Sequence, residues 1–175
     1  MKSNIALIGF MGTGKTAVGR LLAEKLGREF IELDVLIEQR AGKTIPEIFE
    51  QEGEIAFRER EIEATREVAE KGNAVIACGG GIALNQINID RLRKNSVIVY
   101  LTASPDAILK RTSSDKDERP LLVAEDKAAK VDALLKLRKP FYERAADITV
   151  DTSKLEVTEV VEQILTGLSE HESHH

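Results

Sequence analysis

The sequence predicts an α/β protein with three layers, in which a five-stranded parallel sheet lies between two layers of helices. Short runs rich in β-forming residues alternate with helical patterns, as is typical of a parallel sheet covered on both faces. The chain has 175 residues, the usual size of one domain, without an internal repeat or a low-complexity linker. We therefore expect a single domain over residues 1–168, followed by a disordered polar tail at residues 169–175.

Five short runs have the length and composition of buried strands. They lie at residues 4–9, 30–33, 74–78, 96–101 and 147–151. Most of the segments between these runs have helical patterns. Helices are predicted at residues 15–26, 34–40, 54–71, 126–144 and 156–168, and two more are predicted to begin at Thr44 and Pro105.

Several residues mark where the predicted helices begin, end or bend. Gly27 follows the first helix, and a glycine at that position commonly ends a helix. Thr44 is the expected N-cap of the third helix, and Glu47 three residues later completes a capping box. Pro140 is expected to kink or break the helix over residues 126–144, because proline lacks the N–H group that an interior position requires.

Composition and charge narrow the classes of partner. The net charge is −5 and aromatic residues make up 4% of the chain, whereas nucleic-acid binders usually carry a basic excess and aromatic stacking surfaces. No apolar stretch approaches the roughly 20 residues that a membrane span requires. The single cysteine, Cys78, permits no intramolecular disulfide and is most simply a core residue. We therefore expect a cytoplasmic monomer that acts on a small molecule, without nucleic acid or membrane as partner.

Residues 9–16 match the P-loop pattern G-x-x-x-x-G-K-[ST] at every fixed position. A predicted strand ends at Gly9 and a predicted helix begins at Lys15, which is the context that this motif requires. Backbone N–H groups of such a loop, together with the helix N-terminus, attract phosphate. We expect Lys15 to reach the β- and γ-phosphates and Thr16 to bind Mg²⁺. The motif predicts nucleotide binding but leaves the phosphoryl acceptor open.

Six stretches follow one another in a characteristic order. They are GFMGTGKT at 9–16, FIELD at 30–34, FREREIE at 57–63, CGGG at 78–81, ERPLL at 118–122 and KLRKPFY at 136–142. In this order and spacing the chain resembles the shikimate kinase family, from Ile5 to about Asp151. The resemblance implies a P-loop kinase fold of the nucleoside-monophosphate-kinase type, with strand order 2-3-1-4-5. It also implies substrate-binding helices at about 34–61, a mobile lid at about 112–124, and transfer of the γ-phosphoryl group of ATP to the 3-hydroxyl of shikimate.

Two acidic residues lie at the end of the second predicted strand, at the edge of the sheet where such folds bind ligands. The resemblance implies that Asp34 contacts the shikimate hydroxyls and acts as the base, whereas the residues alone also permit a helix N-cap. Glu32 lies on the same face of the strand and is a candidate ligand of Mg²⁺, directly or through water. The family usually carries Asp there, so a structural Glu32 is the alternative.

Arginines provide the candidate site for the acceptor's carboxylate. Arg58 and Glu61 are three residues apart on a helix, so their side chains can meet. The resemblance implies that Arg58 and Arg138 clamp the carboxylate in bidentate fashion while Glu61 orients Arg58. Without the family pattern, Arg58 would be expected to be a solvated surface residue. The other residues that the resemblance places around shikimate are Gly80, Gly81, Phe49 and Phe57. The phenylalanines are alternatively core residues.

A second set of residues is assigned to ATP. Those implied by the motif and the resemblance are Gly12, Thr13, Gly14, Lys15, Thr16, Ala17, Arg111 and Arg119. Arg119 lies in the polar stretch that forms the lid, and closure is expected to bring it to the transferring phosphate. With Asp34 and Lys15 it completes the predicted catalytic set. Arg111 is expected to lie against the adenine, and Lys110 is the competing candidate because the lid carries an extra residue relative to the family.

Two other functions are open at this point. One is another small-molecule kinase, such as a gluconokinase or a nucleoside monophosphate kinase, since gluconate is also a carboxylated polyol. The other is a nucleotide-binding module without catalysis, which the joint presence of the candidate Asp and Arg residues disfavours. Switch GTPases and motor ATPases are disfavoured because no acid ends the third predicted strand, at Cys78.

Overall fold

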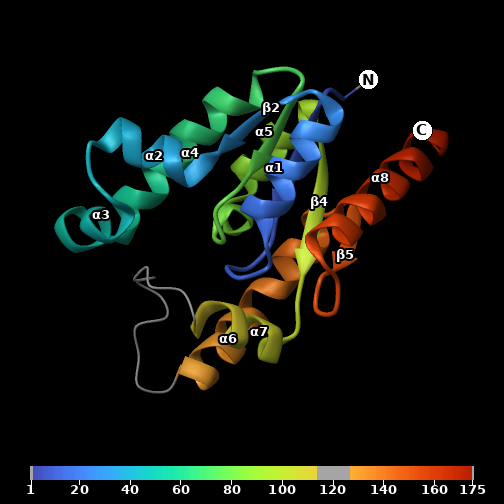
Figure 1. Cartoon of the computed structure of the whole chain (residues 1–175). Helices are drawn as coiled ribbons and strands as arrows, with labels where there is room; N and C mark the ends of the chain where they lie inside the picture. Colours follow the sequence, from blue (N-terminus) through green and yellow to red (C-terminus); the bar gives the residue numbers. More distant parts are fainter. Residues whose placement is uncertain (1, 114–126, 175) are drawn as a thin grey trace.

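A five-stranded parallel sheet forms the centre of the structure, a computed structural model that describes residues 2–113 and 127–174 (Figure 1). Its strands are β1 (Asn4–Ile8), β2 (Glu29–Glu32), β3 (Ala74–Ala77), β4 (Ser96–Thr102) and β5 (Ile148–Asp151). They lie in the order β2-β3-β1-β4-β5, and every neighbouring pair is parallel. The predicted sheet and its strand order are confirmed.

Two layers of helices cover the sheet. The first consists of α1 (Lys15–Leu26) and α8 (Val157–Ser173). The second consists of α2 (Leu33–Ala41), α3 (Ile45–Glu52), α4 (Glu54–Ala69), α5 (Gln86–Asn95), α6 (Pro105–Ser113) and α7 (Lys127–Ala145), with the short 3₁₀ helix η1 (Ile82–Leu84). In Figure 1, α2, α3 and α4 extend to one side of the sheet.

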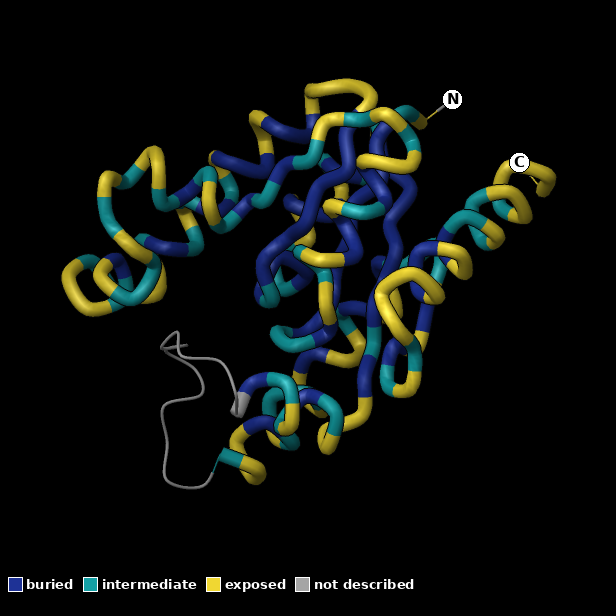
Figure 2. The backbone as a smooth tube through the Cα atoms, in the orientation of Figure 1, coloured by how far each residue is buried: buried dark blue, intermediate teal, exposed yellow. Residues whose placement is uncertain are grey.

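The two layers explain the unbroken apolar character of the central strands. In β1, Ile5 and Leu7 pack with residues of α1 and α8, whereas Ala6 and Ile8 pack with the other layer. All five residues of β1 are buried, and the dark centre of Figure 2 shows the same for the neighbouring strands. A strand covered on both faces has no side that favours polar residues, so its sequence does not alternate.

Local capping at two helix ends follows the sequence prediction. Thr44 caps α3, and its Oγ1 accepts a hydrogen bond from the Glu47 N–H at 3.3 Å. The Glu47 carboxylate accepts from the Thr44 hydroxyl at 3.1 Å rather than from the Thr44 backbone N–H, so the predicted N-cap is confirmed but the full capping box is not formed. Gly27 ends α1 in the left-handed conformation, with φ of 63°.

Helix α5 and the turn η1 form where the sequence analysis predicts no element. Helix α5 is mostly polar: three of its ten residues are apolar, and only Ile89 and Leu92 of these are buried, so the segment resembles a polar connection. The helix is fixed instead by tertiary contacts. Asn88 is fully buried and donates a hydrogen bond from Nδ2 to the carbonyl oxygen of Ile82 at 3.2 Å.

Three predicted boundaries are corrected by the structure. Pro140 does not break α7, which continues to Ala145, because the buried residues Arg138 and Tyr142 hold the helix against the core on either side of it. Helix α8 continues to Ser173, so residues 169–173 are helical rather than a disordered tail. No Gly or Pro follows Gly167, and extending a formed helix costs little. Thr112 and Ser113 belong to α6, and the rest of the predicted lid, residues 114–124, lies outside the described residues.

The carboxyl ends of β1, β2 and β3 meet at one edge of the sheet. Ala77 of β3 pairs with Leu7 of β1 on one side and with Glu32 of β2 on the other. The loops that follow these three strands therefore leave the sheet at the same level, which brings the P-loop, Asp34 and the triple glycine together. In the part of the chain that the structure describes, no helix is both long and apolar enough to cross a membrane.

Candidate active site

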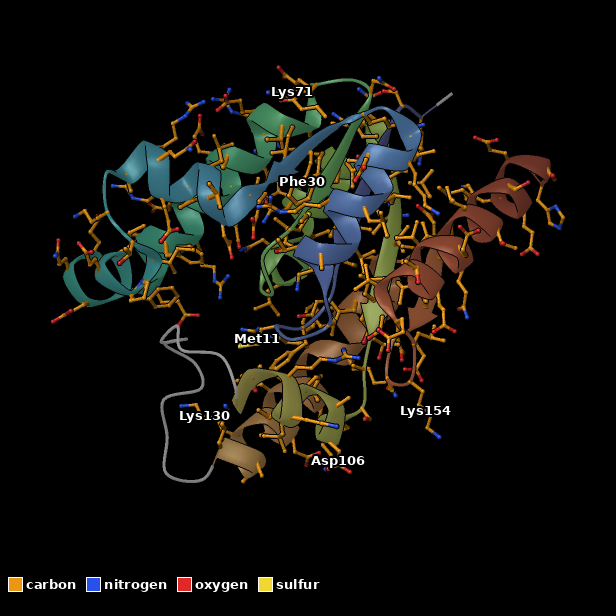
Figure 3. All side chains as sticks on the ribbon, viewed as in Figure 1. Met11, Phe30, Lys71, Asp106, Lys130 and Lys154 are labelled. Carbon is orange, nitrogen blue, oxygen red and sulfur yellow. The ribbon has the colours of Figure 1, made fainter. Side chains whose placement is uncertain are left out.

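The loop between β1 and α1 forms a backbone cradle whose shape depends on glycine. Gly12 and Gly14 have φ of 79° and 90°, values that favour glycine, and a side chain on Gly9 would collide with the carbonyl oxygen of Leu101. Met11 lies on the same loop (Figure 3). Helix α1 begins at Lys15, so its N-terminus faces the cradle, as phosphate binding requires.

The predicted ATP residues of this loop surround a cavity of about 370 Å³, named the phosphate cavity below. Those that line it are Gly12, Gly14, Lys15, Thr16 and Ala17. Lys15 Nζ donates to the carbonyl oxygens of Gly9 at 2.6 Å and Phe10 at 2.9 Å, so its charge is held over the cradle. Thr13 is buried instead, and its hydroxyl donates to the carbonyl oxygen of Phe10 at 2.8 Å. Its side chain stabilises the loop.

Thr16 and Glu32, the predicted metal-side residues, are in direct contact. The Thr16 hydroxyl donates to Glu32 Oε1 at 2.7 Å, and both residues line the phosphate cavity. Donation of the proton to Glu32 leaves the Thr16 oxygen with lone pairs directed elsewhere. Two hard oxygen donors side by side suit Mg²⁺, which normally takes its remaining ligands from phosphate and water. The longer Glu side chain therefore reaches the Thr16 hydroxyl, and its role as the metal-side acid stays a prediction.

Asp34 is the second residue of α2 and lies in the first turn of that helix. The N-cap position belongs to Glu32, so the alternative interpretation of Asp34 as an N-cap is wrong. Its Oδ1 atom is buried and has no hydrogen-bond partner among the residues that the structure describes. Burial raises the pKa of Asp34 above its ordinary value, the charge of Lys15 lowers it, and Glu32 and Glu38 raise it further. This environment suits a proton acceptor.

Arg58 and Glu61 meet on α4 as their spacing predicts. Arg58 Nη1 donates to Glu61 Oε1 at 3.1 Å, and a weaker contact of 3.5 Å joins its Nη2 to Glu54. Glu61 is fully buried, and burial raises the pKa of its carboxyl to about 7, although the charge and hydrogen bond of Arg58 lower it. Arg58 is therefore oriented into the site rather than solvated on a surface.

Arg138 enters the same site from α7. It is buried, with an exposed fraction of 3%, and within residues 2–113 and 127–174 its Nε and Nη1 atoms have no hydrogen-bond partner. Its guanidinium lies 5.7 Å from the ring centre of Phe10. A buried cation with unpaired N–H groups is costly unless an anion completes it. Arg138 thus marks the position at which a bound anion is needed.

The three glycines after β3 each face one of these functional side chains. A Cβ on Gly79 would lie 2.6 Å from Asp34 Oδ1, and one on Gly80 would lie 3.3 Å from Arg138 Nη1. A Cβ on Gly81 would overlap the guanidinium of Arg58. The absence of side chains at 79–81 is therefore what allows the carboxylate and the two guanidinium groups to lie against this backbone.

These residues line a second cavity of about 570 Å³, next to the phosphate cavity and named the acceptor cavity below. Among its lining residues are Asp34, Phe49, Phe57, Arg58, Glu61, Gly80, Gly81 and Arg138. Phe49 and Phe57 form one wall, with ring centres 4.9 Å apart. Phe57 is buried, so the predicted wall residue is also part of the core. Five residues line both cavities and mark where they meet: Met11, Glu32, Asp34, Gly79 and Gly80.

Arg111 and Lys110 differ in position. Arg111 lines the phosphate cavity and donates to the carbonyl oxygen of Gly12 at 3.1 Å and to that of Thr152 at 2.7 Å. Lys110 is exposed and is absent from the residues that line that cavity. Of the two candidates, Arg111 therefore lies where an ATP contact is possible. Arg119 lies outside the described residues.

Gly79 and Thr152 are among the residues at the site that the sequence prediction does not include. Gly79 faces Asp34, although only the second and third glycines of the motif were assigned to the acceptor. Thr152 follows β5, is buried, and binds Arg111 through both its hydroxyl and its carbonyl oxygen. Gly79 could have been predicted, because it belongs to the motif CGGG. Thr152 could not, because a single threonine after a strand belongs to no motif.

Comparison with known proteins decides between the kinases that share this fold. A family model described as shikimate kinase matches residues 11–169. The chain belongs to the shikimate kinase family. A shikimate kinase from Pelotomaculum thermopropionicum is 47% identical over 168 residues, covering 96% of each chain. One from Caldanaerobacter subterraneus is 48% identical over 162 residues, covering 93% of this chain and 94% of the other.

The same family appears among solved structures. The shikimate kinase from Acinetobacter baumannii in complex with shikimate has a TM-score of 0.92 and 41% identity, covering 97% of this chain and 94% of the other. The resemblance and the P-loop kinase fold predicted from the sequence are thus confirmed. Membership of the family favours shikimate kinase over gluconokinase, nucleoside monophosphate kinase and a non-catalytic module.

Proposed function

We propose that the chain transfers the γ-phosphoryl group of ATP to the 3-hydroxyl of shikimate at the two joined cavities. ATP-dependent phosphorylation of a shikimate hydroxyl is the activity of the shikimate kinase family, to which the chain belongs. The observation that carries the assignment of the acceptor cavity is the buried guanidinium of Arg138 with its unpaired N–H groups. The carboxylate of shikimate would complete them, together with Arg58.

The phosphate cavity would hold the phosphates of ATP. Lys15 and the N–H groups of the P-loop neutralise the phosphate oxygens, and Arg111 lies at the side of the same cavity. Thr16 and Glu32 are the residues that would hold Mg²⁺, which when bound neutralises charge on the phosphates. We propose that Arg119, from the lid, adds a further positive charge at the transferring group.

Asp34 would prepare the acceptor hydroxyl. Asp34 is one of the residues where the two cavities meet, so a hydroxyl placed there lies between the base and the phosphates. As the new O–P bond forms, the bond between the γ-phosphorus and the β,γ-bridging oxygen of ATP breaks and ADP leaves, while the hydroxyl proton passes to the carboxylate of Asp34. The raised pKa of Asp34 makes the carboxylate a stronger base, while the charge of Lys15 favours its ionised form.

The carboxylate clamp would fix which hydroxyl reacts. Arg58 and Arg138 hold one end of the ring, Phe49 and Phe57 contact its apolar edge, and Gly80 and Gly81 let the backbone approach closely. Most of the catalysis then arises from positioning and charge neutralisation. We further propose that the enzyme acts as a cytoplasmic monomer on this small molecule, without a nucleic-acid or membrane partner.

The position of the new phosphate tests this proposal. With ATP, Mg²⁺ and shikimate, ³¹P and ¹H NMR of the product should show a phosphate ester on the 3-oxygen alone. A phosphate on another hydroxyl would mean that the clamp holds the ring differently, and no phosphorylated product would contradict the proposal. Shikimate alone should also raise the melting temperature, whereas a non-catalytic module would show neither the shift nor turnover.

A further inference from the structure

Tyr142 links two parts of the acceptor cavity without lining it. It lies on α7, one helical turn after Arg138, and only 1% of it is exposed. Its hydroxyl donates a hydrogen bond to the carbonyl oxygen of Gly80. Its ring stacks on that of Tyr100 from β4, with centres 5.1 Å apart and an interplanar angle of 28°. The stacked ring gives the hydroxyl one fixed position.

The same hydroxyl interacts with Arg138. Burial raises the pKa of Tyr142 to about 12, while the charge of Arg138 and a hydrogen bond from it lower the pKa. The hydroxyl therefore stays protonated at neutral pH and donates to Gly80. Because Arg138 lies one turn away on the same helix and its Nη1 lies 3.3 Å from the Cβ position of Gly80, this bond holds the Gly80 backbone against the Arg138 guanidinium.

Gly80 lies where the two cavities join. Its Cβ position is 3.3 Å from Arg138 Nη1, 3.8 Å from the Met11 nitrogen and 3.9 Å from the Gly9 carbonyl oxygen. This glycine is thus packed between the carboxylate clamp and the P-loop. A shift of its carbonyl group would move the acceptor backbone relative to both the clamp and the phosphates.

We propose that Tyr142 is a positioning residue, which fixes Gly80 and Arg138 relative to each other and so sets the geometry of the site for the acceptor's carboxylate. The proposal rests on the function proposed above, in which Arg138 binds the carboxylate of shikimate. Tyr142 itself contacts neither substrate. Its effect should therefore appear in acceptor binding and leave ATP binding unchanged.

The test is Tyr142→Phe, which keeps the ring stack and removes only the hydroxyl. Tyr100→Phe is the matched control, since Tyr100 is also buried in the same stack but its hydroxyl interacts with the side chain of Thr102. We expect Tyr142→Phe to raise the KM for shikimate about fivefold to tenfold, which is what loss of one buried hydrogen bond implies. The KM for ATP should stay within about twofold of the parent value, and Tyr100→Phe should resemble the parent.

Two results would overturn the proposal. One is an unchanged KM for shikimate in Tyr142→Phe. The other is an equal rise in both KM values in both variants, which would indicate general loosening of the core. Melting temperatures show whether Tyr142→Phe is unfolded at the assay temperature. If it is, a double-mutant cycle replaces the kinetic test: shikimate binding is measured by calorimetry at low temperature for Tyr142→Phe, Arg138→Lys and the double variant. There, losses smaller than additive support the proposal, and fully additive losses contradict it. Turnover of shikimate by the parent tests the proposed function separately.

Discussion

Replacing Gly79 with alanine would place a methyl group against the carboxylate of Asp34. The new Cβ would lie 2.6 Å from Asp34 Oδ1 and 3.3 Å from Glu61 Oε2. Ordinary van der Waals contact begins near 3.4 Å, so the Asp34 carboxylate or the loop must move by roughly 0.8 Å. Asp34 is a short side chain on a helix and has few alternative rotamers, so the proposed base is displaced.

We expect Gly79→Ala to lower kcat by about tenfold to a hundredfold, because misplacing a reacting group by about 1 Å can cost about 10²-fold. This loss equals about 1.4 to 2.7 kcal/mol of activation free energy. The KM for ATP should change little, because the atoms nearest the new methyl group belong to Asp34 and Glu61 and not to the P-loop.

The assay is ADP release at saturating ATP and shikimate, with both KM values measured. Gly72→Ala is the matched control. A Cβ on Gly72 meets only Ser3 Oγ, at 3.4 Å, and its φ lies outside the left-handed region. This variant should keep the parent's kinetics. A kcat within about twofold of the parent's in Gly79→Ala, at an unchanged melting temperature, would refute the argument that this glycine is needed to place Asp34.

Three further predictions concern charged residues of the acceptor cavity. Asp34→Asn should remove most turnover and leave calorimetric ATP binding nearly intact, and a variant as active as the parent would rule out the base. Arg58→Lys should raise the KM for shikimate about tenfold because the bidentate contact is lost, and an unchanged KM would remove Arg58 from the clamp. The third prediction follows from burial, which raises the pKa of Glu61 from 4.5 to about 7. A raised carboxyl pKa stabilises the folded state at low pH, and this contribution is lost as the pH rises through 7. Relative to Glu61→Gln, the parent should lose roughly 3 kcal/mol of unfolding free energy in urea between pH 4 and 8. Its KM for shikimate should fall over the same range, because the ionised carboxylate orients Arg58. Parallel pH profiles for the parent and the Gln variant, in stability or in KM, would contradict the assignment.

Features that depend on neighbours along the chain could be predicted from the sequence. The P-loop is contiguous, so its glycines, Lys15 and Thr16 were identified from one short motif. Arg58 and Glu61 are three apart on a helix, and that spacing alone brings them to the 3.1 Å contact that the structure contains. Parallel pairing likewise places Glu32 beside the P-loop, where its hydrogen bond to Thr16 is found.

Features that depend on contacts through space could not be predicted in the same way. Helix α5 is mostly polar, and its buried Asn88 bonds to the carbonyl oxygen of Ile82. Arg138 could be assigned only through the family resemblance, because its distance from Arg58 depends on how α7 packs. The match of Gly79 to Asp34 and the hydrogen bond of Tyr142 to Gly80 join segments far apart in the sequence. No local pattern encodes such contacts.

The central claim is that the joined cavities accept shikimate as the phosphoryl acceptor. The most direct measurement is initial-rate ADP release with ATP and Mg²⁺ over a panel of acceptors that includes shikimate, gluconate and nucleoside monophosphates. Our account predicts that kcat/KM for shikimate exceeds that for every other acceptor by at least about a hundredfold. The rigid ring of shikimate holds a hydroxyl at Asp34 while its carboxylate is in the arginine clamp, whereas gluconate is an open chain and nucleoside monophosphates have no carboxylate. Faster turnover of gluconate or of a nucleotide than of shikimate would contradict it.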